Sequence, residues 1–231
     1  MKLLIIGGTR FIGREIARLA TEAGHDVILF NRGQTDPGSD LPTILGDAAR
    51  LAEHRDELRA MRPDAVIHCI AYTEQDAEQV IDVFAGLDTH LVVLGSQDCY
   101  AGFQQFRSRQ ETTDFPITED APLAGPYYWR GTEHAKADTY DKNLMTATLL
   151  KGHAAARVHA TVLRLPMVYG PGDRQFANRH GDIIWRVLDE QREFVIGHRE
   201  QGIVWTYGYI TNVAAAVLHA EIGRASCRER G

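Results

Sequence analysis

The chain has 231 residues, 44% of them hydrophobic, which suffices for one large α/β domain or for one domain and part of a second. Its formal net charge of −6 argues against nucleic acid as a partner, and no apolar run approaches the ~20 residues of a membrane-spanning helix. The three cysteines are isolated and the histidines lack ligand spacing, so we expect no disulfide framework, no metal site and a location in the reducing cytoplasm.

Short apolar runs alternate with amphipathic stretches along residues 1–165. These runs are apolar on both faces, as parallel strands are when helices cover both sides of their sheet. They are KLLIIG, DVILF, PTIL, DAVIHCIA, HLVVLG and ATVLRL, which begin at residues 2, 26, 42, 64, 90 and 160. Helical periodicity is expected at 11–23, 49–61 and 76–87, and Gly24 stands where a helix-terminating glycine belongs. The alternation predicts an α/β fold with a doubly wound parallel sheet of the Rossmann type.

The alternation breaks after residue 100. Residues 101–131 are rich in proline, glycine and aromatic side chains and predict a long irregular loop, and helices are expected again at 181–191 and 211–220. We therefore predict a Rossmann domain over residues 1–170 and a small, truncated substrate lobe with a returning helix over 171–220. Residues 221–231, EIGRASCRERG, resemble an added, non-native tail, with a natural basic tail as the alternative.

A glycine-rich turn, GGTRFIG at residues 7–13, joins the first predicted strand to the first predicted helix. In this position backbone amides and the positive end of the helix dipole can face the pyrophosphate of a dinucleotide. A tight turn without a ligand is the alternative, but the strand–turn–helix context favours a nucleotide. The bulky Arg10 in the middle of the turn is unusual, because glycine is common where phosphates approach.

The turn and several later segments resemble the extended or atypical short-chain dehydrogenase/reductases, the NAD-dependent epimerase/dehydratase group. Gly7 and Gly13 match the first and last glycines of the GxxGxxG loop of that group, and Arg10 replaces the middle one. GDAARL from Gly46, VIHCIA and VLRLPMVYGPGD are similar to further segments of the group, so the resemblance covers residues 1–220. The candidate cofactor-binding residues are Gly7, Thr9, Arg10, Phe11, Ile12, Gly13, Asn31, Arg32, Asp47, Ala71 and Lys142.

The end of the second strand, ILFNRG, bears on which cofactor is preferred. NAD-preferring members carry an acidic residue there for the adenosine ribose, whereas Phe30 takes that place in this chain and Arg32 follows two residues later. Two guanidinium groups can hold a 2′-phosphate through charge-assisted hydrogen bonds. Arg10 and Arg32 therefore predict a clamp for NADP, with NAD as the alternative cofactor. In the competing interpretation Arg10 points to solvent or pairs with Asp36 or Asp40.

The resemblance also implies catalysis by a Ser or Thr, a Tyr and a Lys. Ser96, four residues before Tyr100, is similar to the catalytic serine, although a serine that caps a strand end is the alternative. Lys142 in YDKNLMTA matches the catalytic lysine. A helical YxxxK spacing brings the phenol beside the lysine, yet Asp138 occupies the tyrosine position, and Tyr140 would lie on nearly the opposite helix face.

Three explanations for the missing tyrosine stay open. Tyr127 or Tyr128 approaches Lys142 from the long loop, Asp138 is itself the acid/base, or the site binds a cofactor without redox chemistry. We take Tyr127 as the candidate beside Ser96 and Lys142. The resemblance then implies an epimerase, dehydratase or reductase for a small hydroxylated substrate such as a nucleotide sugar, and it leaves a homodimer open. The rival is a non-catalytic module, because the turn is also similar to that of chloroplast stem-loop RNA-binding proteins.

Overall fold

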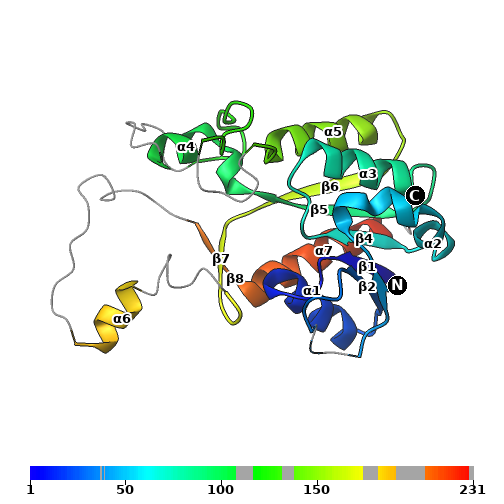
Figure 1. The fold of residues 1–231 in the computed structure, drawn as a ribbon, viewed down its shortest axis with the longest axis horizontal. Helices are drawn as coiled ribbons and strands as arrows, with labels where there is room; N and C mark the ends of the chain where they lie inside the picture. Colours follow the sequence, from blue (N-terminus) through cyan, green and yellow to red (C-terminus); the bar gives the residue numbers. More distant parts are fainter. Residues whose placement is uncertain are drawn as a thin grey trace.

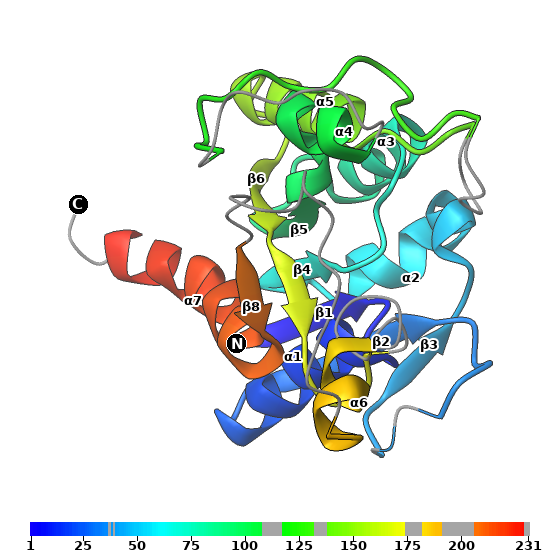
Figure 2. The same ribbon diagram turned by 90° about the vertical axis from the view of Figure 1, so that its left-hand side faces the viewer.

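The computed structural model of the protein describes residues 1–36, 38, 40–107, 117–131, 138–173, 182–190 and 206–228. Its main sheet has six parallel strands in the order β3-β2-β1-β4-β5-β6, and Figure 2 shows them in this order. They are β1 (Lys2–Ile6), β2 (Asp26–Asn31), β3 (Thr43–Leu45), β4 (Ala65–His68), β5 (His90–Ser96) and β6 (His159–Leu165). The order reverses after β3, when the chain crosses to β4 beside β1. The predicted doubly wound parallel sheet is confirmed.

Helices cover both faces of this sheet (Figure 1). One face carries α1 (Phe11–Glu22) and α7 (Ile210–Arg228), and the other carries α3 (Glu74–Phe84) and α5 (Lys142–Ala154). Alternate residues of β1 enter the two cores: Leu4 and Ile6 pack toward α3 and α5, and Leu3 and Ile5 pack toward α1 and α7. All four are fully buried, as expected for a central strand with helices on both sides.

Three segments differ from the helices and loops predicted above. Residues 49–61 are not one helix but η1 (Ala48–His54), kinked at Arg50, followed by α2 (Arg55–Ala60). Part of the predicted irregular loop is a helix, α4 (Ala101–Arg107). In the C-terminal part, β7 (Met167–Tyr169) pairs in parallel with β8 (Tyr207–Tyr209), and α6 (Asp182–Leu188) lies between them in the chain. The apolar run at 194–197 lies outside the described residues.

The C-terminal helix α7 returns to the main sheet. Ala214, Val217 and Leu218 are buried in the same core as Ile16 and Ala20 of α1. The backbone of α7 stays helical to Arg228, so it includes most of the segment read above as a tail. Within the described ranges, no helix is both long and apolar enough to cross a membrane.

Candidate functional site

The glycine-rich turn leaves the start of α1 open. Gly7 has a φ of 85°, and its amide donates to the carbonyl of Phe30 at 3.1 Å, which anchors the turn to the end of β2. Arg10 is the residue that precedes α1, and its side chain makes no capping hydrogen bond. By contrast, Thr73 caps α3 and Asp141 caps α5 with side-chain oxygens. The first amides of α1 are therefore available to an anion.

The first and last glycines of the turn touch each other. A Cβ on Gly13 would lie 2.3 Å from the carbonyl oxygen of Gly7 and 3.0 Å from Cα of Gly8, so only glycine permits this contact. Phe11 has a φ of 40°, a left-handed conformation that costs free energy for a bulky side chain. Strain concentrated at a turn is typical of a site whose backbone must meet a ligand closely.

Phe30 lies near the end of β2. Its side chain is fully buried, with its ring 5.1 Å from that of His54, so it belongs to the core and cannot face a cofactor. The next residue, Asn31, is partly exposed, and its Oδ1 accepts a hydrogen bond from the Gly33 amide at 2.8 Å. Its Nδ2 is buried and has no hydrogen-bond partner among the residues that the structure describes. A buried donor without an acceptor is rare, and a ligand oxygen would satisfy it.

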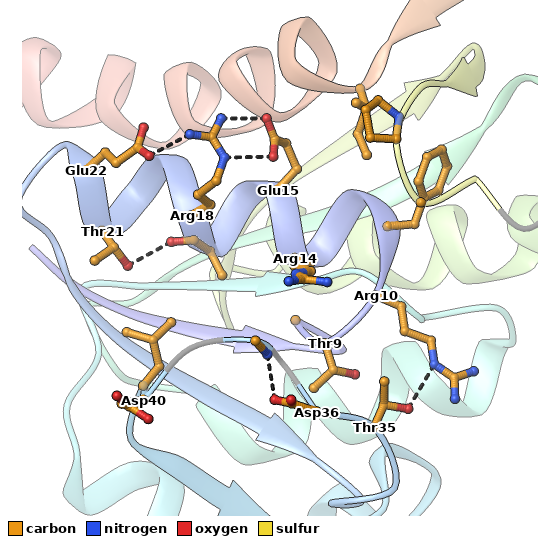
Figure 3. A pocket seen from close by; sticks show the side chains of 18 residues that line it. Thr9, Arg10, Arg14, Glu15, Arg18, Thr21, Glu22, Thr35, Asp36 and Asp40 are labelled. Carbon is orange, nitrogen blue, oxygen red and sulfur yellow. Dashed lines mark hydrogen bonds and ion pairs between the residues drawn. The ribbon is translucent and has the colours of Figure 1, made fainter.

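Arg10 turns toward the loop that follows β2. Its Nε donates to Oγ1 of Thr35 at 2.9 Å, as Figure 3 shows. Among the described residues it forms no ion pair with Asp36 or Asp40, which were its expected partners in the competing interpretation. Arg32 lies exposed in the same loop. The structure thus places one guanidinium of the predicted clamp against this loop, and the other within it.

A cavity of about 850 Å³ runs along α1 beside the same loop. Arg10, Arg14 and Arg18 line it, one helical turn apart from each other (Figure 3). Arg18 is bound by two carboxylates, from Glu15 at 2.7 Å and Glu22 at 2.6 Å, and its hydrogen bond to Glu15 lowers the pKa of that carboxyl to about 2. Neither Arg10 nor Arg14 has a carboxylate partner within the described part of the chain.

Lys142 lies at the carboxyl ends of the adjacent strands β4 and β5. Its Nζ donates to the carbonyl of Ala71 at 2.6 Å and to that of Leu94 at 2.5 Å, and it lies 4.8 Å from the centre of the Tyr72 ring. The residue is only 4% exposed, and this burial lowers the pKa of its ammonium group to about 8. An ammonium has three N–H donors, so two carbonyls leave one for another acceptor.

The helix that carries Lys142 begins later than the family spacing requires. Lys142 is the first residue of α5, and Asp141 caps it by accepting from the amides of Asn143 and Leu144, both at 2.9 Å. Asp138 and Tyr140 therefore precede the helix, and the expectation of an i, i+4 relationship was wrong. Asp138 is exposed while Lys142 is buried, so they are not a surface ion pair.

Tyr140 instead joins a buried cluster around Asp98. Its hydroxyl donates to Oδ2 of Asp98 at 2.8 Å, and Nε1 of Trp129 donates to the same oxygen at 3.1 Å. The hydroxyl of Tyr128 donates to Oδ1 at 3.2 Å. Burial, together with the nearby Asp98 charge, raises the pKa of both phenols far above the ordinary value. These two tyrosines are thus held as neutral hydrogen-bond donors.

The remaining predicted catalytic residues lie close to this cluster. Ser96 ends β5, and its Oγ accepts from the amide of Asp98 at 3.3 Å, which is the capping geometry considered as an alternative. Tyr127 donates its amide to Oδ2 of Asp141 at 2.8 Å, while its ring lies 4.6 Å from the guanidinium of Arg130. It is the hydroxyl of Tyr128 that accepts from the Lys142 amide, at 3.3 Å.

Comparison with known proteins assigns the chain to a family. Residues 3–221 match the model of the NAD dependent epimerase/dehydratase family. The chain belongs to this family. The recognition made from the glycine turn and the later segments is therefore confirmed.

Solved structures support the fold at low sequence identity. UDP-glucose 4-epimerase from Brucella ovis in complex with NAD is 16% identical, with a TM-score of 0.69 over 97% of this chain and 74% of that one. UDP-glucose 4-epimerase from Thermotoga maritima with UDP-glucose is 17% identical, with a TM-score of 0.67 over 95% of this chain and 73% of that one. The chloroplast stem-loop binding protein of 41 kDa b from Arabidopsis thaliana is 49% identical over 41 residues, which are 18% of this chain and 11% of that protein.

Two more of the predicted cofactor-binding residues, Asp47 and Ala71, have local structural roles. Asp47 caps η1 by accepting from the Ala49 amide at 3.0 Å, and Ala71 is buried and supplies one of the carbonyls that bind Lys142. Asp98 is not among the site residues predicted from the sequence. Its position two residues after Ser96 was the one signal that could have indicated a place in the site. Within the described ranges, no group of three or more His, Cys, Asp or Glu side chains could hold a metal ion.

Proposed function

We propose that the protein binds a nicotinamide dinucleotide at the turn between β1 and α1 and acts on a hydroxylated small molecule. The observation that carries the proposal is the contact between Gly13 and Gly7 at an uncapped helix start, which keeps backbone amides free for a pyrophosphate. The unpartnered Nδ2 of Asn31 fits an oxygen of the adenosine half. Family membership and the NAD bound by the Brucella ovis enzyme support the same ligand class.

NADP is the preferred form of the cofactor in this proposal. Arg10 donates a hydrogen bond to Thr35, has no carboxylate partner within the described ranges, and lies beside the loop that contains Arg32. A 2′-phosphate between two guanidinium groups gains charge-assisted hydrogen bonds that NAD cannot make. We expect wild type to bind NADPH at least tenfold more tightly than NADH, by fluorescence titration, and Arg32→Ala to lose most of that preference. Tighter binding of NADH by wild type would remove the clamp.

The proposed reaction begins with transient oxidation of the substrate. The nicotinamide, when bound, supplies a hydride acceptor, and the protein must hold the substrate carbon near it and remove the hydroxyl proton. In this proposal Ser96 orients the substrate oxygen, and the third N–H of Lys142 binds a ribose hydroxyl. Tyr127 is the proposed proton carrier. This assignment requires its ring to leave the position beneath Arg130 when substrate binds.

A nucleotide sugar is the proposed substrate class, as in the Thermotoga maritima structure with UDP-glucose. The test is to incubate the protein with NADP and UDP-glucose and to follow new sugar signals by NMR. We expect turnover that falls at least a hundredfold in Ser96→Ala and in Tyr127→Phe. Turnover that neither change affects would refute the catalytic assignment.

A second candidate function is cofactor-dependent binding without redox chemistry. Its support is the cluster at Asp98, which holds Tyr128 and Tyr140 as neutral hydrogen-bond donors. These two phenols therefore do not act as the base of a redox reaction. The short match to a stem-loop binding protein makes RNA the ligand to test. Cofactor binding without turnover of any nucleotide sugar, together with salt-dependent RNA binding, would favour this function.

A further inference from the structure

Asp98 carries a buried carboxylate that accepts its hydrogen bonds from neutral donors. The residue is 7% exposed, and no ion pair among the described residues includes it. A buried carboxylate is costly unless hydrogen bonds replace its lost water. Two phenols and one indole supply those bonds, at 2.8 to 3.2 Å. Such an arrangement persists only if the surrounding segments are fixed relative to each other.

The donors come from segments far apart in the sequence. Asp98 lies in the turn after β5, Tyr128 and Trp129 lie in the 117–131 segment, and Tyr140 precedes α5. A second set of bonds joins the same segments, because Nδ2 of Asn143 donates to the carbonyls of residues 99 and 124 at 3.0 and 3.1 Å. The carboxylate therefore connects three segments: its own turn after β5 and the two segments that supply its donors.

Two candidate catalytic residues are connected to Asp98 by hydrogen bonds. The Lys142 amide donates to the hydroxyl of Tyr128, whose own proton is donated to Asp98. The amide of Asp98 donates to Oγ of Ser96. Displacement of Asp98 would thus reach Ser96 through the Asp98 amide, and movement of its carboxylate would reach Lys142 through the Tyr128 phenol.

We propose that Asp98 is a positioning residue of the candidate site, which holds Tyr128 and Tyr140 as donors and thereby fixes Lys142 at the ends of β4 and β5. The role of Asp98 in a catalytic site rests on the proposed function. The experiments below test the positioning itself and do not require that function. The groups that favour the charged form of Lys142 are Asp98, Asp76, Cys69 and Cys99, whereas burial opposes it.

The direct test is Asp98→Asn, in which one acceptor oxygen becomes an NH₂ group that faces other donors. Ultraviolet titration of tyrosinate should show phenols that ionise at least about one pH unit earlier than in wild type, because the charge that opposes their ionisation is gone. NMR of labelled lysine should show the Lys142 titration shifted below its wild-type midpoint. Asp120→Asn, at an exposed position, is the matched control.

Tyrosine and Lys142 titrations in Asp98→Asn that coincide with those of the control would overturn the proposal. If Asp98→Asn does not fold, Tyr128→Phe provides the test, since it removes the acceptor of the Lys142 amide and keeps the charge. Hydrogen exchange of that amide should then accelerate at least tenfold, whereas Tyr127→Phe should leave it unchanged, and equal exchange in both would also refute the proposal. A wild type that binds no nicotinamide cofactor refutes the proposed function, and leaves these readouts intact.

Discussion

Single residues decide whether the turn between β1 and α1 can bind a dinucleotide. The family resemblance allowed Gly7 and Gly13 to be predicted, because glycine is needed where two backbone segments touch. The same reasoning could not show that the side chain of Phe30 packs into the core, since a resemblance gives a position but not which face of the sheet it meets. Asp98 could not be predicted, because its donors lie some 30 and 42 positions away in the chain. Nothing local indicates that a carboxylate there is buried.

Gly13→Ala should damage both stability and cofactor binding. The added methyl group would meet the carbonyl of Gly7, so α1 must shift, which we expect to cost about 1–3 kcal/mol of unfolding free energy. NADPH affinity should fall at least tenfold. Gly125→Ala is the matched control, because nothing lies within 4 Å of a Cβ at that position. Thermal unfolding and fluorescence titration of both variants check the prediction, and equal behaviour of the two would contradict it.

Lys142 should make stability depend on pH in a defined window. Its pKa is lowered from 10.5 to about 8 in the folded protein, so between these values the unfolded chain binds the extra proton. The unfolding free energy contributed by this group therefore rises with pH across that window, and the full cost of the buried charge applies below it. Urea unfolding of wild type and Lys142→Met should show a difference that grows in favour of wild type from about pH 8 upward. A difference independent of pH would contradict the buried-ammonium assignment.

At the scale of elements, the start of α5 determines where Lys142 lies. The sequence carries the signal for this start, because aspartate is a preferred residue immediately before a helix, and Asp141 stands directly before Lys142. The YxxxK comparison outweighed that signal and placed the helix too early. The division of residues 48–60 into η1 and α2 was harder to foresee, since Arg50 gives no break such as proline or glycine.

Asp141→Ala should destabilise the protein through loss of this cap. Its carboxylate accepts from the amides of Asn143 and Leu144 and also from that of Tyr127, so three partly buried donors would lose their partner. We expect a loss of about 2 kcal/mol or more in urea unfolding, the upper end for a helix cap. Asp138→Ala, three residues earlier and exposed, should change stability by less than about 0.5 kcal/mol. Similar losses in both variants would show that the cap is unimportant.

For the whole molecule, the alternation of apolar strands and amphipathic helices was enough to predict the doubly wound sheet. All six runs correspond to strands, because burial on both faces leaves a strong apolar signal. The pairing of β7 with β8 was not predictable in the same way. Each of these strands has only three residues, too few for a periodic pattern. The two strands are also far apart in the sequence, because α6 and segments that the structure does not describe lie between them.

The returning helix α7 should be needed for the whole fold. Ala214 is fully buried between α7 and the core that includes α1, whereas Ala216 is exposed on the same helix. Ala214→Asp should therefore lower the unfolding free energy by several kcal/mol, because a charge would be buried without a partner. Ala216→Asp introduces the same side chain on the exposed face and should be nearly neutral. Circular dichroism melting curves that coincide for the two variants would contradict this role of α7.

The central claim is that the amides at the start of α1 receive a pyridine dinucleotide, and isothermal titration calorimetry tests it most directly. NADPH titrated into the intact chain should release heat with one site per molecule, and Gly13→Ala should abolish or severely weaken that heat while Gly125→Ala preserves it. Absence of heat with NADPH, NADP, NADH and NAD alike would contradict the account, as would undiminished binding by Gly13→Ala.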